Sequence, residues 1–320
     1  MRKNVLAESS AEPSVERYTN LFVRYFVATR PSFLMATLAA CLLGLASAIV
    51  SGVSFNVETA ALTTLLALLV HAAVNVLNDY FDALNGSDAI NTERLYPFTG
   101  GSRFIQNGVL TTTQTASFGY LLLAVAMLGG LWLSWLVGAG LLLIGAIGVF
   151  VGWAYSAAPL RLNSRGLGEL CVLVEFLGIT VGADFVQRQA FSFQPLIVGM
   201  PYALLVTNLL YINQFPDRKA DAAAGKHHLV VRLPLNQAIL VYPILAGLAF
   251  VWLVFFVSLG KLPMLAILSA LPLLFSARAS WLLRQFAATP AHLLSAIQLT
   301  LAAMLSHALL LTLLIILETP

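Results

Sequence analysis

The chain has 320 residues, of which 59% are hydrophobic and only 10% are charged. Its mean hydropathy is +0.88 and its formal net charge is +3. Because a soluble domain is about a quarter charged, this composition excludes an ordinary soluble enzyme and indicates a polytopic membrane protein. The small positive charge gives no reason to expect nucleic-acid binding, because the basic residues follow the predicted membrane topology.

The first 30 residues are polar and basic, and they carry Arg2, Lys3, Arg17, Arg24 and Arg30. No short apolar stretch followed by a cleavage site begins the chain, so no signal peptide is expected. We expect residues 1–30 to form a cytoplasmic, partly disordered tail that leads into an interfacial helix. Residues 31–320 are expected to form one transmembrane domain.

Apolar runs follow one another from residue 31 onward, each close to the roughly 20 residues that cross a bilayer. Their Leu, Ala, Ile and Val content is continuous rather than alternating, which favours helices over barrel strands. The predicted fold class is all-α, a polytopic membrane protein of about nine transmembrane helices. The expected spans are residues 31–50, 58–78, 114–133, 135–156, 167–187, 193–213, 235–258, 261–281 and 292–317.

The distribution of basic residues predicts the orientation of these spans. If the N-terminus is cytoplasmic and the spans alternate in direction, every Lys and Arg except Arg188 and Lys261 falls on the cytoplasmic side. The loops after the second and sixth spans are then both cytoplasmic. Polar clusters lie at the start of each of these two loops.

The first cluster is Asn78-Asp-Tyr-Phe-Asp82, with Asp88 a few residues further on. On a helix, Asn75, Asn78, Asp79 and Asp82 are spaced i, i+3, i+4 and i+7, so they share one face. Caps and turns also use Asn and Asp at helix ends, which is the alternative interpretation of one such cluster taken alone.

The second cluster has the same form, because Asn213, Asp217 and Asp221 are spaced i, i+4 and i+8 on one helix face. Carboxylates at the edge of a bilayer are costly unless something pairs with them. Two matching sets on the same predicted side indicate a shared partner rather than two unrelated caps. Carboxylate and amide oxygens suit Mg²⁺, which also binds substrate phosphates.

Other polar residues in or near the spans carry weaker indications. Glu175 lies about two turns into the span 167–187, where it could face a cavity and orient a substrate, or bond a neighbouring helix. Cys41 and Cys171 are expected to be packing residues rather than a disulfide or a metal pair. His227 and His228 are expected to be interfacial.

Taken together, these motifs resemble those of the UbiA superfamily of intramembrane prenyltransferases. The resemblance rests on the pair of Asp motifs and on shorter matches at Arg30-Pro31, Tyr155-Ser156, Arg165-Gly-Leu-Gly-Glu169 and Ala222-Ala-Ala-Gly-Lys226. It implies nine helices around a central cavity with cytoplasmic cap loops and a side opening to lipid. It also implies Mg²⁺-dependent transfer of a polyprenyl group from its diphosphate to an aromatic acid, in a bacterial inner membrane.

The loop after the first Asp motif indicates a branch of the superfamily. The segment Thr99-Gly-Gly-Ser-Arg-Phe-Ile-Gln-Asn-Gly108 resembles the 1,4-dihydroxy-2-naphthoate branch of menaquinone synthesis. The Arg-rich stretch ending in Arg-Pro of the 4-hydroxybenzoate, haem O and chlorophyll branches is missing. Transfer to 4-hydroxybenzoate remains the alternative. The chain departs from the family pattern at Glu169, Pro216, His227 and His228, and Pro216 is expected to kink its helix.

Roles for individual residues follow from the spacing and the resemblance together. Two Mg²⁺ ions are expected on Asp79, Asp82, Asp88, Asp217 and Asp221, with Asn78 and Asn213 beside them. The catalytic set is Asp79, Asp82, Asp217, Asp221 and Tyr155. The substrate-binding set is Arg30, Asn78, Arg103, Ser156, Arg161, Asn213 and Lys226. Gly100-Gly101-Ser102 is expected to form a tight turn whose backbone N–H groups face an anion.

A transporter is the competing class, since intramembrane acids and repeated halves are features of transporters. Transporter sites lie near the middle of the bilayer, inside the spans. Both Asp clusters here lie at span ends, beside Lys and Arg residues suited to phosphate groups. Their position therefore favours the enzyme.

Overall fold

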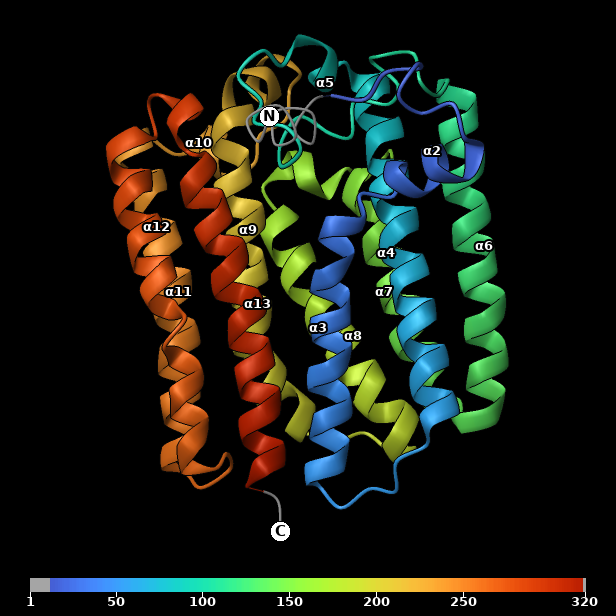
Figure 1. Cartoon of the computed structure of the whole chain (residues 1–320), viewed down its shortest axis with the longest axis vertical. Helices are drawn as coiled ribbons and strands as arrows, with labels where there is room; N and C mark the ends of the chain where they lie inside the picture. Colours follow the sequence, from blue (N-terminus) through green and yellow to red (C-terminus); the bar gives the residue numbers. More distant parts are fainter. Residues whose placement is uncertain (1–11, 319–320) are drawn as a thin grey trace, which may run out of the picture.

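The computed structural model describes residues 12–318, and within that range the chain is helical with no strand. Nine long helices of this part run roughly along one common axis and form a bundle (Figure 1). They are α3 (Pro31–Val50), α4 (Val57–Asn85), α6 (Thr112–Val137), α7 (Gly140–Ser156), α8 (Gly168–Arg188), α9 (Gln194–Ala223), α11 (Leu235–Ser258), α12 (Leu273–Phe286) and α13 (Leu294–Leu317).

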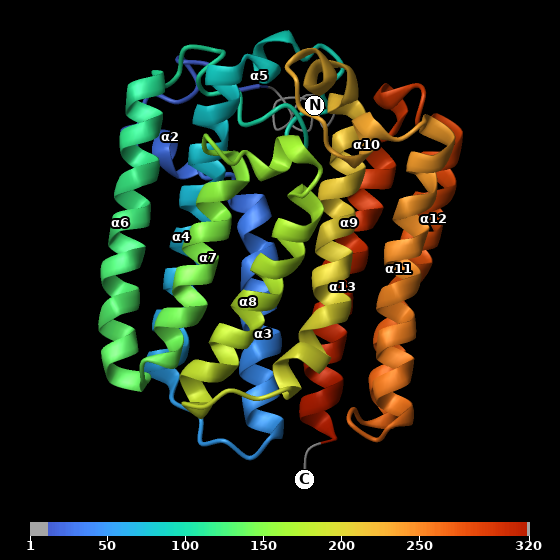
Figure 2. The ribbon, with the colours of Figure 1, turned by 180° about the vertical axis from the view of Figure 1, so that it is seen from behind.

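Short helices gather at one end of the bundle. Both views place α2 (Leu21–Ala28), α5 (Ser87–Ile90) and α10 (Leu229–Arg232) at the end where α4 and α9 finish (Figures 1 and 2). We call the loops at this end, residues 86–111 and 224–234, the cap. Short 3₁₀ segments complete the chain: η1 (Leu162–Arg165), η2 (Met264–Ala270) and η3 (Pro290–His292).

Local sequence fixes several helix starts. Asn56 precedes α4 and its side chain accepts a hydrogen bond from the Thr59 N–H. Thr111 and Gln114 form a reciprocal capping box at the start of α6. Pro31 is the first residue of α3, where its missing N–H costs nothing. These signals set where the chain leaves a loop and enters the bundle.

The bundle is built around α9, which is mostly buried and packs against α3, α8, α11 and α13. Buried tyrosines on α9 tie it to its neighbours: the Tyr202 hydroxyl donates to the Ala36 carbonyl and the Tyr211 hydroxyl to the Ala238 carbonyl, each at 2.7 Å. Small residues let α3 approach α8, since a Cβ on Gly44 would lie 2.2 Å from the Thr180 carbonyl oxygen. Close backbone approach of this kind is typical of membrane helices.

All nine predicted spans appear as parts of the bundle, and the chain is a polytopic integral membrane protein. Seven helices of the described part are long and apolar enough to cross a membrane by length and composition, and α7 is a shorter apolar helix. The remaining one, α8, contains Glu169, Glu175 and Asp184, which makes its apolar character weaker.

Two predicted boundaries were wrong in the same way. The helices α4 and α9 continue past residues 78 and 213 to Asn85 and Ala223, so Asp79, Asp82, Asp217 and Asp221 lie within helices, as their spacing on one helix face predicts, and not after the helix ends. The helix α9 also runs on through Pro216. The expected span 261–281 is instead the 3₁₀ segment η2 followed by α12, because Pro272 interrupts the run. Residues 1–11 of the predicted tail lie outside the described residues, and α2 is the helix expected at its end.

Candidate active site

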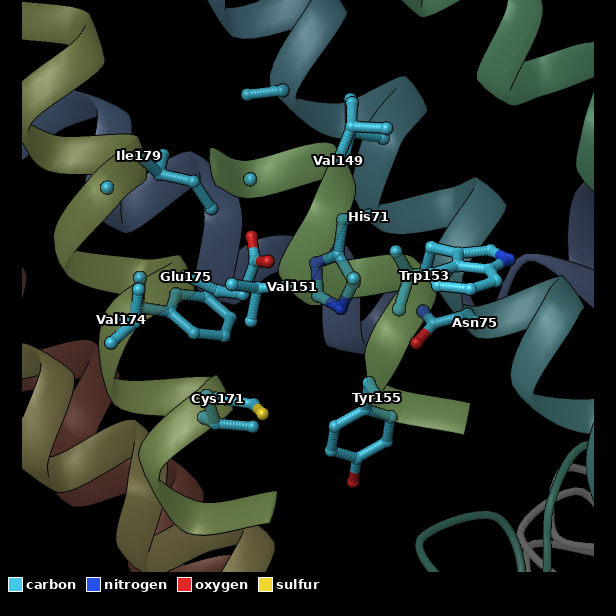
Figure 3. A pocket seen from close by; sticks show the side chains of 18 of the residues that line it. His71, Asn75, Val149, Val151, Trp153, Tyr155, Cys171, Val174, Glu175 and Ile179 are labelled. Carbon is cyan, nitrogen blue, oxygen red and sulfur yellow. The ribbon is translucent and has the colours of Figure 1, made fainter. Parts of the chain in front are cut away.

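A cavity of about 1200 Å³ extends from the cap into the middle of the bundle, lined by α3, α4, α6, α7, α8 and α9. Aliphatic side chains form most of its wall. Figure 3 shows part of this wall, where His71, Asn75, Tyr155 and Glu175 lie among apolar residues. Charged side chains are concentrated beneath the cap, where Asp82, Asp88, Asp217, Asp221, Lys226 and His228 all line the cavity.

The two Asp motifs meet at this charged end through one lysine. The Lys226 ammonium lies 2.7 Å from Asp82 Oδ1 on α4 and 3.4 Å from Asp221 Oδ1 on α9. His228 Nε2 lies 3.1 Å from the other oxygen of Asp221. Residues far apart in the sequence are therefore brought within reach of one small ligand.

The cap loop supplies further partners for the same carboxylates. Asn91 donates a hydrogen bond to Asp217 at 2.6 Å. The Gly100 N–H donates to Asp217 at 3.3 Å and the Ser102 N–H donates to Asp79 at 3.1 Å. The expected turn does direct its backbone N–H groups at anions, and in this structure those anions are the protein's own aspartates.

Only glycine fits at the centre of that turn. Gly101 has a φ of +73°, in the left-handed region that favours glycine. A Cβ on Gly101 would lie 2.3 Å from Asp88 Oδ2 and 3.0 Å from Asp79 Oδ1. The missing side chain therefore lets two carboxylates approach the turn.

Carboxyl groups predominate at the charged end of the cavity, so this end favours the binding of cations. Burial, and then the charges of Asp82 and Asp79, raise the pKa of Asp88 to about 8. Burial alone would lower the pKa of Lys226, but the charges of Asp82 and Asp221 raise it above its ordinary value. Burial and repulsion by neighbouring carboxylates act on Asp88, whereas attraction to those carboxylates outweighs burial at Lys226.

The donor set fits Mg²⁺ in chemistry, since it consists of carboxylate and amide oxygens. The buried Asn213 Oδ1 and Asn91 Oδ1 have no hydrogen-bond partner within residues 12–318. No group of three or more His, Cys, Asp or Glu side chains in this described part lies close enough to hold a metal ion by itself. Because Mg²⁺ usually takes one or two protein carboxylates and completes its shell with waters and substrate phosphates, this arrangement still fits.

Other predicted site residues lie on or beside the cavity. Asn78 and Tyr155 line it, and Asn78 donates a 2.8 Å hydrogen bond to the Ser156 hydroxyl, which joins α4 to α7. Arg30 also lines the cavity, with its guanidinium 4.3 Å from the centre of the Phe33 ring. Its side chain donates to the carbonyls of Pro97 and Phe98 in the cap.

Two predicted substrate-binding arginines lie off the cavity wall. Arg103 is buried behind the cap loop, where it donates to the Asp88 carbonyl and its Nε lies 3.8 Å from Glu12 Oε2. Arg161 is exposed next to η1. Asp79 is also buried behind the wall and reaches the site through Ser102.

Sequence reasoning missed some of the residues at this site. His228 was expected to be interfacial, but it is only 3% exposed and bonds Asp221, whereas His227 is exposed. Asn91 and Gln214 line the cavity without having been singled out. Gln214 adjoins the Asn213 motif and could have been found there. Asn91 carries no spacing signal, because its position depends on how the cap loop folds.

Comparisons with known proteins show what the chain is similar to. A family model described as the UbiA prenyltransferase family matches residues 34–295. The 1,4-dihydroxy-2-naphthoate octaprenyltransferase of Bacillus subtilis is 26% identical over 246 residues, covering 72% of this chain and 73% of the relative. The enzyme of the same name from Escherichia coli is 30% identical over 211 residues, covering 64% of this chain and 66% of the relative.

A solved structure shares the fold. The structure of a UbiA homolog from Archaeoglobus fulgidus bound to DMAPP and Mg²⁺ has a TM-score of 0.67 and 13% sequence identity to this chain. The match covers 91% of this chain and 100% of that one. At this identity the likeness shows the arrangement of helices alone.

Proposed function

Because the chain belongs to the UbiA prenyltransferase family and is a membrane prenyltransferase, we propose that it transfers a polyprenyl group from polyprenyl diphosphate to an aromatic acid. The proposed acid is 1,4-dihydroxy-2-naphthoate, as in quinone biosynthesis, and the proposed cofactor is Mg²⁺. The observation that carries this proposal is the position of Lys226 between Asp82 and Asp221 at the charged end of an apolar cavity.

The charged end is proposed to hold the diphosphate. Asp82, Asp88, Asp217 and Asp221 would hold Mg²⁺, which neutralises the charge that grows on the leaving diphosphate as the allylic C–O bond breaks. With the aspartates so occupied, the Lys226 ammonium is released to donate to phosphate oxygens. Tyr155 lines the same cavity and Ser156 is bonded to the lining residue Asn78, and their hydroxyls are proposed to donate as well.

The apolar part of the cavity is proposed to hold the prenyl chain and the acceptor ring. Its volume of about 1200 Å³ exceeds the roughly 300–1,000 Å³ of ordinary small-molecule sites, as a long hydrocarbon requires. Aliphatic walls also keep water from an allylic cation until a ring carbon attacks it. Diphosphate leaves with the electrons of the C–O bond as the cation forms, and after the attack the ring loses a proton, or its carboxylate as carbon dioxide, so that the remaining electron pair restores its aromaticity.

The acceptor carboxylate is proposed to pair with Arg30. Arg103 and Arg161, the arginines favoured from the sequence, lie off the cavity wall, whereas Arg30 lines it near the cap. The naphthoate is favoured over a single-ring acid by the cap-loop sequence and by the printed names of the Bacillus subtilis and Escherichia coli relatives. A bacterial inner membrane with the cap in the cytoplasm is the proposed setting, from the basic-residue distribution.

The proposal is tested with purified protein in lipid, given a polyprenyl diphosphate and one aromatic acid at a time. We expect 1,4-dihydroxy-2-naphthoate to be prenylated faster than 4-hydroxybenzoate, and chelation of Mg²⁺ to abolish both reactions. A clear preference for the single-ring acid would refute the acceptor but not the chemistry. Absence of diphosphate release with every acid would refute the prenyltransferase proposal itself.

A further inference from the structure

Among the described residues that line the cavity, Glu175 carries the one carboxyl group that lies away from the charged end. It projects from α8 toward α7 (Figure 3). There its two carboxylate oxygens lie 3.7 Å from the positions that a Cβ on Gly148 and a Cβ on Gly152 would take. The glycines of α7 therefore leave room for the Glu175 carboxyl group at the cavity wall.

The depth of Glu175 follows from contacts between helices. The bond between Asn78 and Ser156 places these two residues at one level, one turn below Asp82. Gly152 and Gly148 lie one and two turns deeper than Ser156 along α7. At 5.4 Å per turn, the Glu175 carboxylate lies about 10–15 Å below Asp82, measured along the bundle axis. The space between is where the ring that attacks the allylic carbon must lie.

One oxygen of the Glu175 carboxyl group lacks a hydrogen-bond donor. Its Oε1 is buried and has no hydrogen-bond partner within residues 12–318. A carboxylate without a partner inside the bilayer is expensive, and such residues are usually retained for function. A prenyl chain offers only C–H groups, so the chain cannot supply the missing hydrogen bond.

The opposite wall is polar at a similar depth. The ring of His71 on α4 packs edge-on against Phe176, the neighbour of Glu175, with ring centres 5.8 Å apart. His71 Nδ1 lies 2.7 Å from the Thr37 hydroxyl, which occupies that ring nitrogen. Asn75, one turn nearer the cap, also lines the cavity. This part of the wall is built for a polar molecule rather than for hydrocarbon alone.

We propose that Glu175 accepts a hydrogen bond from a ring hydroxyl of the acceptor and so fixes which way round the acceptor binds. The inference rests on the proposed function and specifies the acceptor site further. The negative carboxylate of the acceptor is attracted by Arg30, which lines the cavity near the cap, so the hydroxyl points into the bundle and the carboxylate toward the cap. The site therefore takes ring acids that carry a free hydroxyl away from the carboxylate.

A chemical double cycle tests this contact. The acceptor is compared with its two mono-methyl ethers, in wild type and in the Glu175→Leu and Glu175→Gln variants. We expect Glu175→Leu to raise the acceptor KM by up to about tenfold, the usual worth of one hydrogen bond. The KM for prenyl diphosphate should stay nearly the same. Glu175→Gln, whose amide oxygen still accepts, should lie between the two.

The cycle distinguishes a direct contact between Glu175 and the acceptor hydroxyl from an indirect effect of the substitution on packing. One methyl ether should have a higher KM than the free hydroxyl acid in wild type. In Glu175→Leu the same methylation should not raise the KM further, because two changes at one contact are not additive. Additive penalties for both ethers, or an unchanged acceptor KM in Glu175→Leu, would overturn the inference.

A matched control is available on the same helix. Asp184 is a buried carboxylate of α8 that pairs with Arg188 at 2.7 Å, away from the cavity wall. Asp184→Asn should lower the melting temperature and leave the acceptor KM unchanged. An equal rise of KM in this variant would mean that α8 packing, not a contact, explains the Glu175 result.

Equilibrium binding of labelled acceptor to the purified protein, which needs no turnover, separates this inference from the proposed function. Acceptor that binds but is not prenylated would refute the function. The ratio of the acceptor Kd in Glu175→Leu to that in wild type would still decide the inference. Failure of wild type to bind any of the acids would refute both.

Discussion

Lys226 is the residue on which the charge balance of the site depends. Its ammonium is the cation that bridges Asp82 and Asp221, and both carboxylates are largely buried. Breaking a buried ion pair by removing one partner is strongly destabilising, because the remaining charge keeps its desolvation cost. The same lysine is also the group proposed to receive phosphate oxygens.

Replacement of Lys226 should therefore change stability and metal response together. We expect Lys226→Met to destabilise the protein by about 3–5 kcal/mol in the absence of divalent metal. Mg²⁺ should raise the melting temperature of the variant more than that of wild type, because only the variant lacks a counter-ion for the carboxylates. An equal Mg²⁺ shift in both proteins would show that Lys226 and the metal do not share these aspartates.

The aspartates can be tested with nearly isosteric changes. Asp82→Asn and Asp217→Asn should each lower turnover by at least about a hundredfold, the usual size of losing one electrostatic stabiliser of a transition state. Glu93→Gln is the control, because Glu93 is also acidic and near the cap but pairs with the exposed Lys219. Turnover like that of wild type in both aspartate variants would contradict the metal assignment.

At the scale of elements, hydropathy and local signals predicted the helices well and their ends less well. An apolar run is a local property, so each of the nine expected spans was visible in the sequence. The ends of α4 and α9 were not, because Asp79, Asp82 and Asp217 end the apolar runs, whereas the helices continue through them to positions where these carboxylates have partners. Those partners, Ser102, Lys226 and Asn91, come from distant parts of the chain and depend on tertiary packing.

In the cap loop too, site residues whose positions depend on tertiary contacts could not be predicted from the local sequence. Its glycines predicted a turn that faces an anion, since this depends on local backbone freedom. The direction of Arg103 was not predictable, because it depends on Glu12, a residue 91 positions earlier in the sequence. Spacing identifies residues on one helix face, but it does not say which way a loop arginine turns.

The turn offers a comparison of two glycines with similar backbones. Gly101 and Gly108 have φ values of +73° and +69°, but a Cβ on Gly108 would meet nothing within 4 Å. We expect Gly101→Ala to abolish most activity and Gly108→Ala to cost only the ordinary left-handed strain of about 1–2 kcal/mol. Equal activity in the two variants would mean that the approach of Asp88 to the turn is not needed for catalysis.

Glu12 joins the segment before α2 to the cap. It lies 2.6 Å from Arg94 and accepts a hydrogen bond from Asn107 at 3.3 Å. Burial opposes the charge, but the bonds to Asn107 and Arg94 outweigh it and lower the pKa of Glu12 below its ordinary value. A carboxyl with a lowered pKa stabilises the fold above its ordinary pKa, and that stabilisation is lost as pH falls through the lowered value.

Glu12→Gln should therefore lower the melting temperature at pH 7 and have a smaller effect at pH 4 and below. Thermal unfolding of both proteins across this pH range measures the difference. A difference that grows as the solution becomes more acidic would contradict the ion-pair role.

At the scale of the whole molecule, both Asp motifs lie at one end of the bundle, but the structure does not assign that end to a side of the membrane. The distribution of basic residues predicts that the cap lies in the cytoplasm. Single cysteines at Lys219 and Lys261, which are exposed near opposite ends of the bundle, test this after removal of the buried Cys41 and Cys171. An impermeant thiol reagent on the cytoplasmic face should label position 219 and spare 261. The reverse pattern would invert the topology.

The short length of α7 has a consequence for the surrounding lipid. A helix of 17 residues rises only about 25 Å, against a hydrocarbon thickness of about 30 Å. Leu143, Ile147 and Phe150 of α7 are exposed and are also among the residues that line the cavity. Hydrophobic mismatch on this flank is relieved most simply by local thinning of the bilayer, at fractions of a kcal/mol per Å. Thinning would draw headgroups toward the cavity wall, on the flank where a lipid with a diphosphate head could enter most easily.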